Sequence, residues 1–439
     1  MAEEAPKNGT GTTEVKLRRD LGLLEITMIG LGPTIGSTIF LLVGDGIGIA
    51  GPALILVFLL NFFVTILTAM AYAELGSAFS DTGGGYIWVK DGMPQPFGFL
   101  AGWLSWFGHA IVTSFYVIGF GYGVIWLMQA YSVTIPGVST EMLIKLLAVF
   151  ACAIFIVINL RGTKTTGRSS YYITVALIAI VVVYIVAGLT FMLGKPDLGG
   201  SFQPFMLEPD GDREYSGVAS IFIAMGFTFI VFEGYEIIAQ CGEECKDAEK
   251  IIPRASWMAI SISAAIFIMV AVVTIGVVGW ETAAGFGENA VAEVANVSMP
   301  GWGLQLIGIG VIVGALAAVN STLFSSSRVA FAMGRDGVLP KKLGILHASR
   351  QTPHIAILIS GAIIISITVF LPIRQIVVAA DIMFLMLMIF VNVAVMTLRI
   401  KRPEIRRRYV MPLFPIIPII GLITKGIMAY SLWAYEPIA

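Results

Sequence analysis

Charge is scarce in this sequence. Charged residues occupy 13% of its 439 positions and hydrophobic residues 57%, whereas a soluble domain usually carries about 25% charged residues. So few polar side chains cannot cover a water-facing globule, and the apolar runs are close to the roughly 20 residues that cross a bilayer as a helix. Strand-like alternation with short turns is missing, which argues against a β-barrel. The composition therefore predicts an all-α integral membrane protein.

Clusters of catalytic or metal-binding side chains are also missing. The three cysteines (Cys152, Cys241 and Cys245) and three histidines match no disulfide framework or metal motif. No GxxxxGK[ST] phosphate-binding motif occurs, so ATP is not expected to drive the protein directly. These absences argue against a membrane enzyme, and we expect no catalytic residues, no cofactor and no nucleic-acid partner.

The apolar runs predict eleven membrane spans. Their approximate bounds are 23–48, 52–78, 97–131, 142–160, 171–193, 217–240, 255–280, 301–333, 354–371, 376–398 and 412–433. The polar segment 1–20 lacks the apolar core of a signal peptide and is predicted to be a disordered cytoplasmic tail. The glycine-rich stretch 80–97 predicts a surface helix or gate. The acidic stretch 281–300 is either a short lid helix or a solvated linker.

Lysine and arginine are distributed unevenly between the two sides. The tail and every second loop hold 22 of the 27 basic residues, and the opposite loops hold three. Basic loops stay in the cytoplasm, so the N-terminus is predicted to be cytoplasmic. The same alternation supports the count of spans, because one missed span would scramble it. We expect a multi-pass protein of the plasma membrane.

Helix-breaking residues interrupt the first and the sixth span. The first contains GLGPTIGSTIF (30–40), and the sixth contains FIVFEGYEIIAQCGEE (229–244). One pair of small residues would indicate only close helix packing. Two broken spans, five spans apart, instead indicate a transporter in which spans one to five and six to ten are related by a pseudo-two-fold axis in the membrane plane.

Broken helices place unpaired backbone groups in the middle of the bilayer, where only a cavity can accommodate them. Free N–H groups suit a carboxylate, and free carbonyls with Ser or Thr hydroxyls suit an ammonium group or a small cation. The predicted organisation is a tail (1–20), a first inverted repeat (21–195), an extracellular loop (196–215), a second repeat (216–399), and a basic cytoplasmic loop with the last span (400–439).

Six motifs, in order, resemble those of the amino acid/polyamine/organocation transporters, which have the LeuT-type five-plus-five fold. Besides GLGPTIGSTIF they are YAELGSAFSDTGGGYIW, SFQPF, FIVFEGYEIIAQCGEECKDAEKIIPRA, SSSRVAFAMGRDGVLP and LRIKRPEIRRRYVMPLFPIIPIIG. The resemblance covers nearly the whole chain after the tail. The sequence departs from the family at Pro33, at Thr38 (usually Gly) and at Glu233 (usually apolar or small), and most members have twelve spans.

The resemblance implies a substrate site between the two breaks. Two sets of residues would line it: Gly32, Thr34, Gly36, Ser37 and Thr38 toward a carboxylate, and Phe232, Glu233, Gly234 and Tyr235 on the opposite side. The backbone around Phe232 would receive the α-amino group, and an aromatic ring there would act as a gate. His109 of span three is a further candidate, with a packing role as the alternative.

Glu233 is the least expected residue of this set. A carboxylate at mid-membrane costs at least about 2.5 kcal/mol on insertion scales, so it usually pairs or functions. Three roles stay open: binding a cationic substrate, taking up a proton in coupling, or holding the broken helix together as a neutral residue. Glu236, one turn later, is expected to bond the unwound backbone or a neighbouring span, with proton exchange during gating as an alternative.

Coupling to an ion also stays open. Some family members carry a lysine in span five, but the corresponding position here is close to Ala176. Sodium would need oxygen ligands, which Ser321, Thr322 and Ser325 of span eight offer by analogy, although such hydroxyls equally bond their own helix. A proton would use a carboxylate, and Asp381 of span ten is a second candidate for a proton site or outer gate.

The sequence thus predicts a secondary transporter of amino acids, including cationic ones, that works by alternating access. The alternatives are an antiporter of polyamines or organic amines and a non-transporting sensor of the same fold. The expected partners are a small amino acid or amine and the lipid bilayer, in a monomer or homodimer, with coupling to Na⁺ or H⁺ or to neither.

Overall fold

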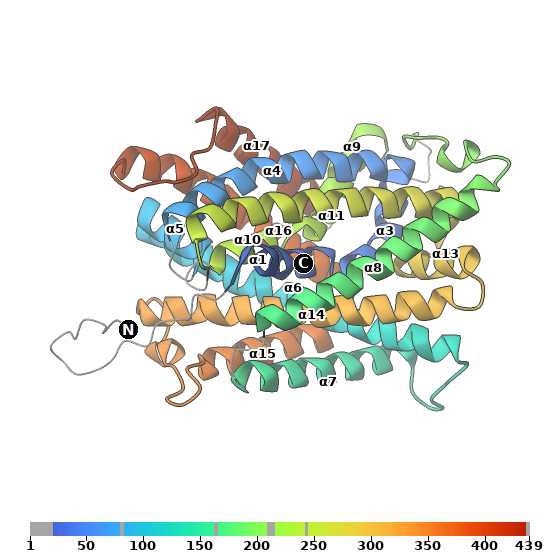
Figure 1. Cartoon of the computed structure of the whole chain (residues 1–439), viewed down its shortest axis with the longest axis horizontal. Coiled ribbons are helices and arrows are strands. Elements are labelled where there is room, and N and C mark those ends of the chain that lie inside the picture. Colours follow the sequence, from blue (N-terminus) through green and yellow to red (C-terminus); the bar gives the residue numbers. More distant parts are fainter. Residues whose placement is uncertain (1–20, 80–82, 162–165, 209–215, 242–244, 436–439) are drawn as a thin grey trace.

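The computed structural model describes residues 21–79, 83–161, 166–208, 216–241 and 245–435. Helices dominate this part of the chain, and most run side by side along the long axis of the molecule (Figure 1). The longer ones are α1 (Leu23–Ile35), α3 (Val43–Ala50), α4 (Leu54–Ala78), α5 (Gly85–Gly92), α6 (Gln95–Ala130), α7 (Thr140–Arg161), α8 (Thr166–Leu193), α9 (Gly217–Phe227), α11 (Ala248–Val278), α13 (Ala290–Ser298), α14 (Gly303–Arg335), α15 (His354–Phe370), α16 (Ile373–Lys401) and α17 (Ile416–Tyr435). The tail 1–20 lies outside the described residues.

The prediction of a helical membrane protein is confirmed. Nine segments in the described ranges are long and apolar enough to cross a membrane, and a helix pair bent by 51°, around Phe227 and Phe229, makes a tenth when taken as one span. The apolar helix α15 has 17 residues and is shorter. The first boundary differs from its prediction: residues 43–48, predicted to end span one, belong to α3, which is part of the same candidate span as α4. An unbroken apolar run does not itself mark where one span gives way to the next.

A central group of helices holds the breaks. Helix α1 packs against α8, α11 and α14, while α6 lies along α14 and α16. Figure 1 shows α1, α6, α10 (Tyr235–Gln240) and α16 between an outer layer with α4 and α17 and another with α7 and α15. Trp106 of α6 donates a 2.9 Å hydrogen bond to Ser360 of α15, which ties this group to the outer layer. The broken segments are therefore enclosed by whole helices.

The two loop segments with ambiguous patterns are helical where they are described. The stretch 80–97 contains α5, but Tyr86, Trp88 and Val89 are buried, so this helix packs into the bundle instead of lying on its surface. The predicted surface position is wrong because the apolar side chains of α5 favour burial. The acidic stretch 281–300 forms α12 (Trp280–Gly285) and α13, which is the lid-helix alternative.

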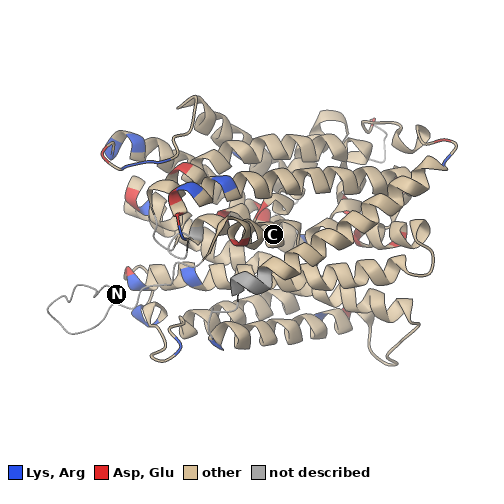
Figure 2. Ribbon diagram, in the orientation of Figure 1, with Lys and Arg blue, Asp and Glu red and all other residues tan. Residues whose placement is uncertain are grey.

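Charge gathers at one end of the bundle. Figure 2 shows most Lys and Arg at the left-hand end, whereas the long middle of the molecule is nearly free of them. At that end Lys90 of α5 donates a 2.7 Å hydrogen bond to Asp336, just after α14. Buried Glu74 of α4 also pairs with Arg399 of α16 and with Arg407. Ion pairs therefore join α4, α5, α14 and α16, with the segments that follow α14 and α16, at the end predicted to be cytoplasmic.

Candidate functional site

The first break lies where GLGPTIGSTIF predicted it. Helix α1 ends at Ile35, and α2 (Thr38–Leu41) begins after Gly36, whose φ of +39° favours glycine. Tyr116 of α6 donates a 2.8 Å hydrogen bond to the carbonyl of Pro33. An oxygen near the end of α1 is therefore paired by a neighbouring helix.

The hydroxyls of the first break differ in what they bond. Thr34 donates to the Gly30 carbonyl at 2.7 Å, and Thr38 donates to the Ile35 carbonyl at 2.9 Å. The buried hydroxyl of Ser37 has no hydrogen-bond partner in the described part of the chain. Of the three hydroxyls predicted to contact substrate, Ser37 is the one that can donate a hydrogen bond without first breaking a bond to a backbone carbonyl.

The second break brings Gly234 against the first. After α9 comes a 3₁₀ turn, η3 (Phe229–Phe232), then extended Glu233 and Gly234 with φ of +127°. A Cβ atom on Gly234 would lie 2.6 Å from the carbonyl oxygen of Gly30. The left-handed backbone and this close approach both require glycine. The two motifs, about 200 residues apart in sequence, thus form one buried centre.

Glu236 and His109 meet at this centre. A carboxylate oxygen of Glu236 accepts a 2.7 Å hydrogen bond from the Gly234 amide, which is the predicted contact with unwound backbone. Its other oxygen lies 3.6 Å from Nε2 of His109. Nδ1 of His109 is 2.6 Å from the Ser105 carbonyl, which can only accept, so Nδ1 carries a proton. His109 therefore belongs to the centre, facing a carboxylate.

Three further charged groups are buried nearby. Glu233 interacts electrostatically with Asp381 of α16, then with Glu236, and is attracted by Lys425 of α17. Among the described residues, no side chain is hydrogen-bonded to a carboxylate oxygen of Glu233 or Asp381, although the backbone N–H of Ile230 approaches Asp381. Lys425 had been assigned no role from the sequence, although a lone lysine in an apolar run is a signal that could have been used.

The aromatic residues of the centre pack tightly. The Phe232 ring lies 5.9 Å from the Phe267 ring of α11, and the Tyr235 ring lies 5.4 Å from the Tyr72 ring of α4. Phe232 and Tyr235 are both fully buried. The side chains around the two breaks are therefore shielded from solvent.

The hydroxyls of span eight engage their own helix. Ser321 and Thr322 donate to the carbonyls of Ala317 and Ala318 at 3.2 and 2.8 Å. Thr322 also accepts a 2.8 Å hydrogen bond from Thr113 of α6. Ser325 is buried. The backbone-bonding alternative holds for Ser321 and Thr322, and α14 is tied to α6 through Thr322.

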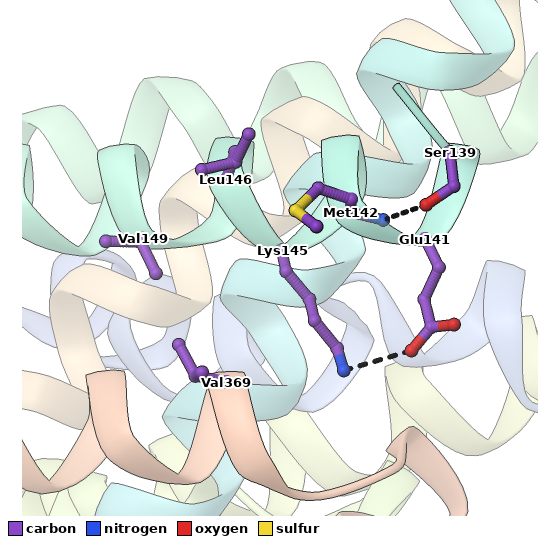
Figure 3. Close-up of a pocket in the computed structure, with 7 residues that line it drawn as sticks. All are labelled: Ser139, Glu141, Met142, Lys145, Leu146, Val149 and Val369. Carbon is purple, nitrogen blue, oxygen red and sulfur yellow. Dashed lines mark hydrogen bonds and ion pairs between the residues drawn. The ribbon is translucent and has the colours of Figure 1, made fainter. Parts of the chain in front are cut away.

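A pocket of about 390 Å³ lies elsewhere, between α7 and the end of α15 (Figure 3). A 3.0 Å ion pair between Glu141 and Lys145 borders it, with Met142, Leu146 and Val369 among the apolar lining residues. None of the residues predicted to bind substrate lines this pocket. It is a feature of the outer layer and not of the broken helices.

Helices that are apolar and long enough to cross a membrane, with two breaks meeting at a buried polar centre, define a helical membrane protein of the transporter type. A profile of the amino acid permease family matches residues 21–437. The chain belongs to this family, and thus to the amino acid/polyamine/organocation superfamily that its motifs resemble.

Curated relatives agree with this family. The chain is 27% identical to the branched-chain amino acid permease BcaP of Bacillus subtilis, covering 92% of this chain and 86% of the relative. It is 28% identical to the serine/threonine exchanger SteT of the same species, covering 94% and 90%. It is 26% identical to the methylthioribose transporter of that species, covering 92% and 86%. These relatives are transporters, not enzymes, and the protein is a multi-pass membrane protein.

Proposed function

We propose that the protein is a secondary active transporter that moves amino acids across the plasma membrane by alternating access. The observation that carries this proposal is the meeting of the two breaks, with Gly234 against the Gly30 carbonyl in a buried centre. Amides and carbonyls freed at such breaks can bind both ends of an amino acid. Family membership and relatives named for amino acids support the same substrate class.

Burial of the centre supports alternating access. The side chains of Ser37, Phe232 and Tyr235 are fully buried, and Glu233 is 2% exposed. A substrate can reach them only if helices move, first on one side and then on the other. The Glu74–Arg399–Arg407 ion pairs and the Lys90–Asp336 pair would open at the basic end, which positive-inside charge places in the cytoplasm with the N-terminus.

Charge supports cationic amino acids among the substrates. The buried centre holds the carboxylates of Glu233 and Asp381, with Lys425 as their nearby cation. When both carboxylates are ionised, they exceed the single Lys425 cation by one charge, and a second ammonium group on a substrate would balance that charge in place of a proton. The named relatives act on branched-chain amino acids, serine and threonine, or methylthioribose, so a neutral substrate is the competing expectation.

Uptake by purified protein in proteoliposomes tests the function. We expect labelled L-arginine to accumulate or exchange, with L-leucine and L-serine competing less well. Glu233→Gln should weaken arginine selectively, whereas Glu141→Gln, at an exposed outer position, should change nothing. If Glu233→Gln reduces the uptake of neutral and cationic substrates equally, Glu233 has a structural or coupling role and does not select cationic substrates.

Two other functions of this fold give different results in the same assay. An amine antiporter would exchange putrescine or spermidine in preference to amino acids. A sensor would bind an amino acid yet move none under any sodium, proton or counter-substrate gradient, and that result would overturn the proposal. A sodium requirement would implicate Ser321, Thr322 and Ser325, of which Ser321 and Thr322 would have to turn from their own carbonyls toward the ion.

A further inference from the structure

Lys425 is buried in the middle of a membrane span. It is the tenth residue of the twenty in α17, and its side chain is fully buried. Its ammonium group makes one long hydrogen bond, 3.4 Å to the Val64 carbonyl of α4, and lies 4.1 Å from the centre of the Phe229 ring. An ammonium group has three donors, and such weak partners do not replace the water that it has left.

Glu233, which interacts electrostatically with Lys425, and Asp381, which interacts with Glu233, also lack side-chain partners. Glu233, four residues after Phe229, attracts Lys425, and Asp381 is the group that repels Glu233 most. Neither carboxylate has a hydrogen-bonded side-chain partner among the described residues, and neither forms an ion pair within 4.0 Å there; the backbone N–H of Ile230 is the group that approaches Asp381. A structural salt bridge would be short and fully bonded. This arrangement instead holds its charges apart.

Other titratable groups face the cluster from the surrounding helices. Tyr72 of α4, Tyr116 of α6 and Tyr235 of α10 all lie within electrostatic reach of Glu233. Glu236 also repels Glu233, but it is bonded to the Gly234 amide and faces His109.

Further charged groups lie on the helices that pack against α17. Glu74 of α4 and Arg399 of α16 pair with each other at the basic end. Lys401 of α16 bonds the Gly92 carbonyl at 3.2 Å. Lys425 therefore remains the basic group that faces Glu233 from α17.

Charge balance leaves one proton to be placed. A neutral amine together with two carboxylate anions carries a charge of −2. Adding two protons makes the group of three neutral. One arrangement is an ammonium group, one carboxylate and one carboxylic acid. The other is a neutral amine with two carboxylic acids. A proton passing from the Lys425 nitrogen to a carboxylate oxygen of Glu233 converts the first into the second without changing the net charge, which a low-dielectric interior favours.

We propose that Lys425, Glu233 and Asp381 form a proton-exchange site that couples movement of the second break to proton movement across the membrane. A carboxylic acid of the cluster loses its proton to water when the site is open to one side, and the resulting carboxylate takes up a proton from water when the site is open to the other. The cluster joins α17, α16 and the break itself, since Glu233 and Phe229 belong to the segment that must move. Shifting that segment changes the distance from the Lys425 nitrogen to the Glu233 oxygens and so where the proton sits. This inference rests on the proposed transport function.

Two measurements separate proton coupling from transport itself: uptake driven by a pH gradient, and exchange of amino acids without a gradient. Proteoliposomes loaded with pyranine would report internal pH while labelled L-arginine, L-leucine or L-serine enters under an imposed pH gradient. Counter-exchange of the same amino acid, without a gradient, measures transport alone. We expect the wild type to do both. Exchange without any effect of the pH gradient would overturn the inference and leave the transport function intact; absence of both would overturn the two together.

Lys425→Arg is the sharpest variant because arginine keeps the charge but cannot release a proton. We expect gradient-driven accumulation to fall by about tenfold, within the range of coupling free energies between sites, while exchange persists. Lys145→Arg, at a partly exposed position of α7 away from the broken helices, is the matched control. Asp381→Asn provides a second variant if Lys425→Arg does not fold, and it should lose the same coupling. Full coupling in either folded variant would show that the cluster is merely structural.

Discussion

The hydroxyl of Tyr116 lies 2.8 Å from the carbonyl oxygen of Pro33, to which it donates a hydrogen bond across two helices. Tyr116 comes from unbroken α6, and Pro33 lies three residues before the turn at Gly36. The contact fixes the end of α1 to a rigid neighbour. The geometry of the first break therefore depends on a residue 83 positions further along the chain.

Replacing Tyr116 with Phe should loosen the first break. The change leaves a buried carbonyl with one partner fewer, which costs about 1–3 kcal/mol. We expect a lower midpoint of thermal unfolding in detergent and weaker amino acid exchange. Tyr430→Phe, at a position 68% exposed on α17, is the control. Equal unfolding midpoints for Tyr116→Phe and the wild type would contradict the role of this hydrogen bond.

Gly234→Ala should disrupt the contact between the two breaks. The added Cβ would meet the Gly30 carbonyl at 2.6 Å, on a backbone with φ of +127°. Backbone strain of this kind costs about 1–3 kcal/mol before the clash is counted. Exchange activity and the unfolding midpoint should both fall. Gly426→Ala, where a Cβ would meet nothing within 4 Å, should behave like the wild type, and a fully active Gly234→Ala would refute the contact.

Glu74→Gln should destabilise the basic end of the bundle. The carboxylate is fully buried and pairs with Arg399 and Arg407, which are 16% and 10% exposed. Removing one member of a buried ion pair typically costs about 3–5 kcal/mol, because the opposite charge stays behind. Thermal unfolding in detergent measures the loss. The exposed pair Arg402–Glu404 supplies the control Glu404→Gln. If Glu74→Gln lowers the unfolding midpoint as little as Glu404→Gln does, the buried ion pair does not stabilise the protein as expected.

The contact between α5 and the end of α14 should respond to acid. Partial burial raises the pKa of Asp336, but hydrogen bonds from Lys90 and Tyr86 outweigh it, so the pKa lies below its ordinary value. A depressed pKa contributes stability above the unfolded value of about 3.9 and loses it as the pH falls through the folded value. The gap in unfolding midpoint between wild type and Asp336→Asn should therefore be constant from neutral pH to about pH 5 and shrink in stronger acid. A gap that widens in acid would show the opposite sign.

Sequence patterns predicted the local features well. Helix breakers identified both interruptions, since Gly36 and Gly234 take backbone angles that favour glycine. Apolar length identified the spans, because a bilayer sets how long a helix must be. The pattern around Glu236 also predicted its bond to unwound backbone, which spans only two residues. The breaks, the span lengths and the Glu236 hydrogen bond all depend on residues that are close together in the sequence.

Partners across helices required the tertiary structure. Thr34 and Thr38 donate hydrogen bonds to carbonyls of α1, while the Ser37 hydroxyl has no hydrogen-bond partner in the described structure; the sequence did not distinguish these three hydroxyls. Nothing in the sequence near Lys425 connects it to Glu233, almost 200 residues away. The sequence by itself determined that this is a helical membrane protein with two breaks, because backbone freedom and apolar length are local properties. Only the packing of α17 and α16 around the second break decided which buried charges share one low-dielectric environment.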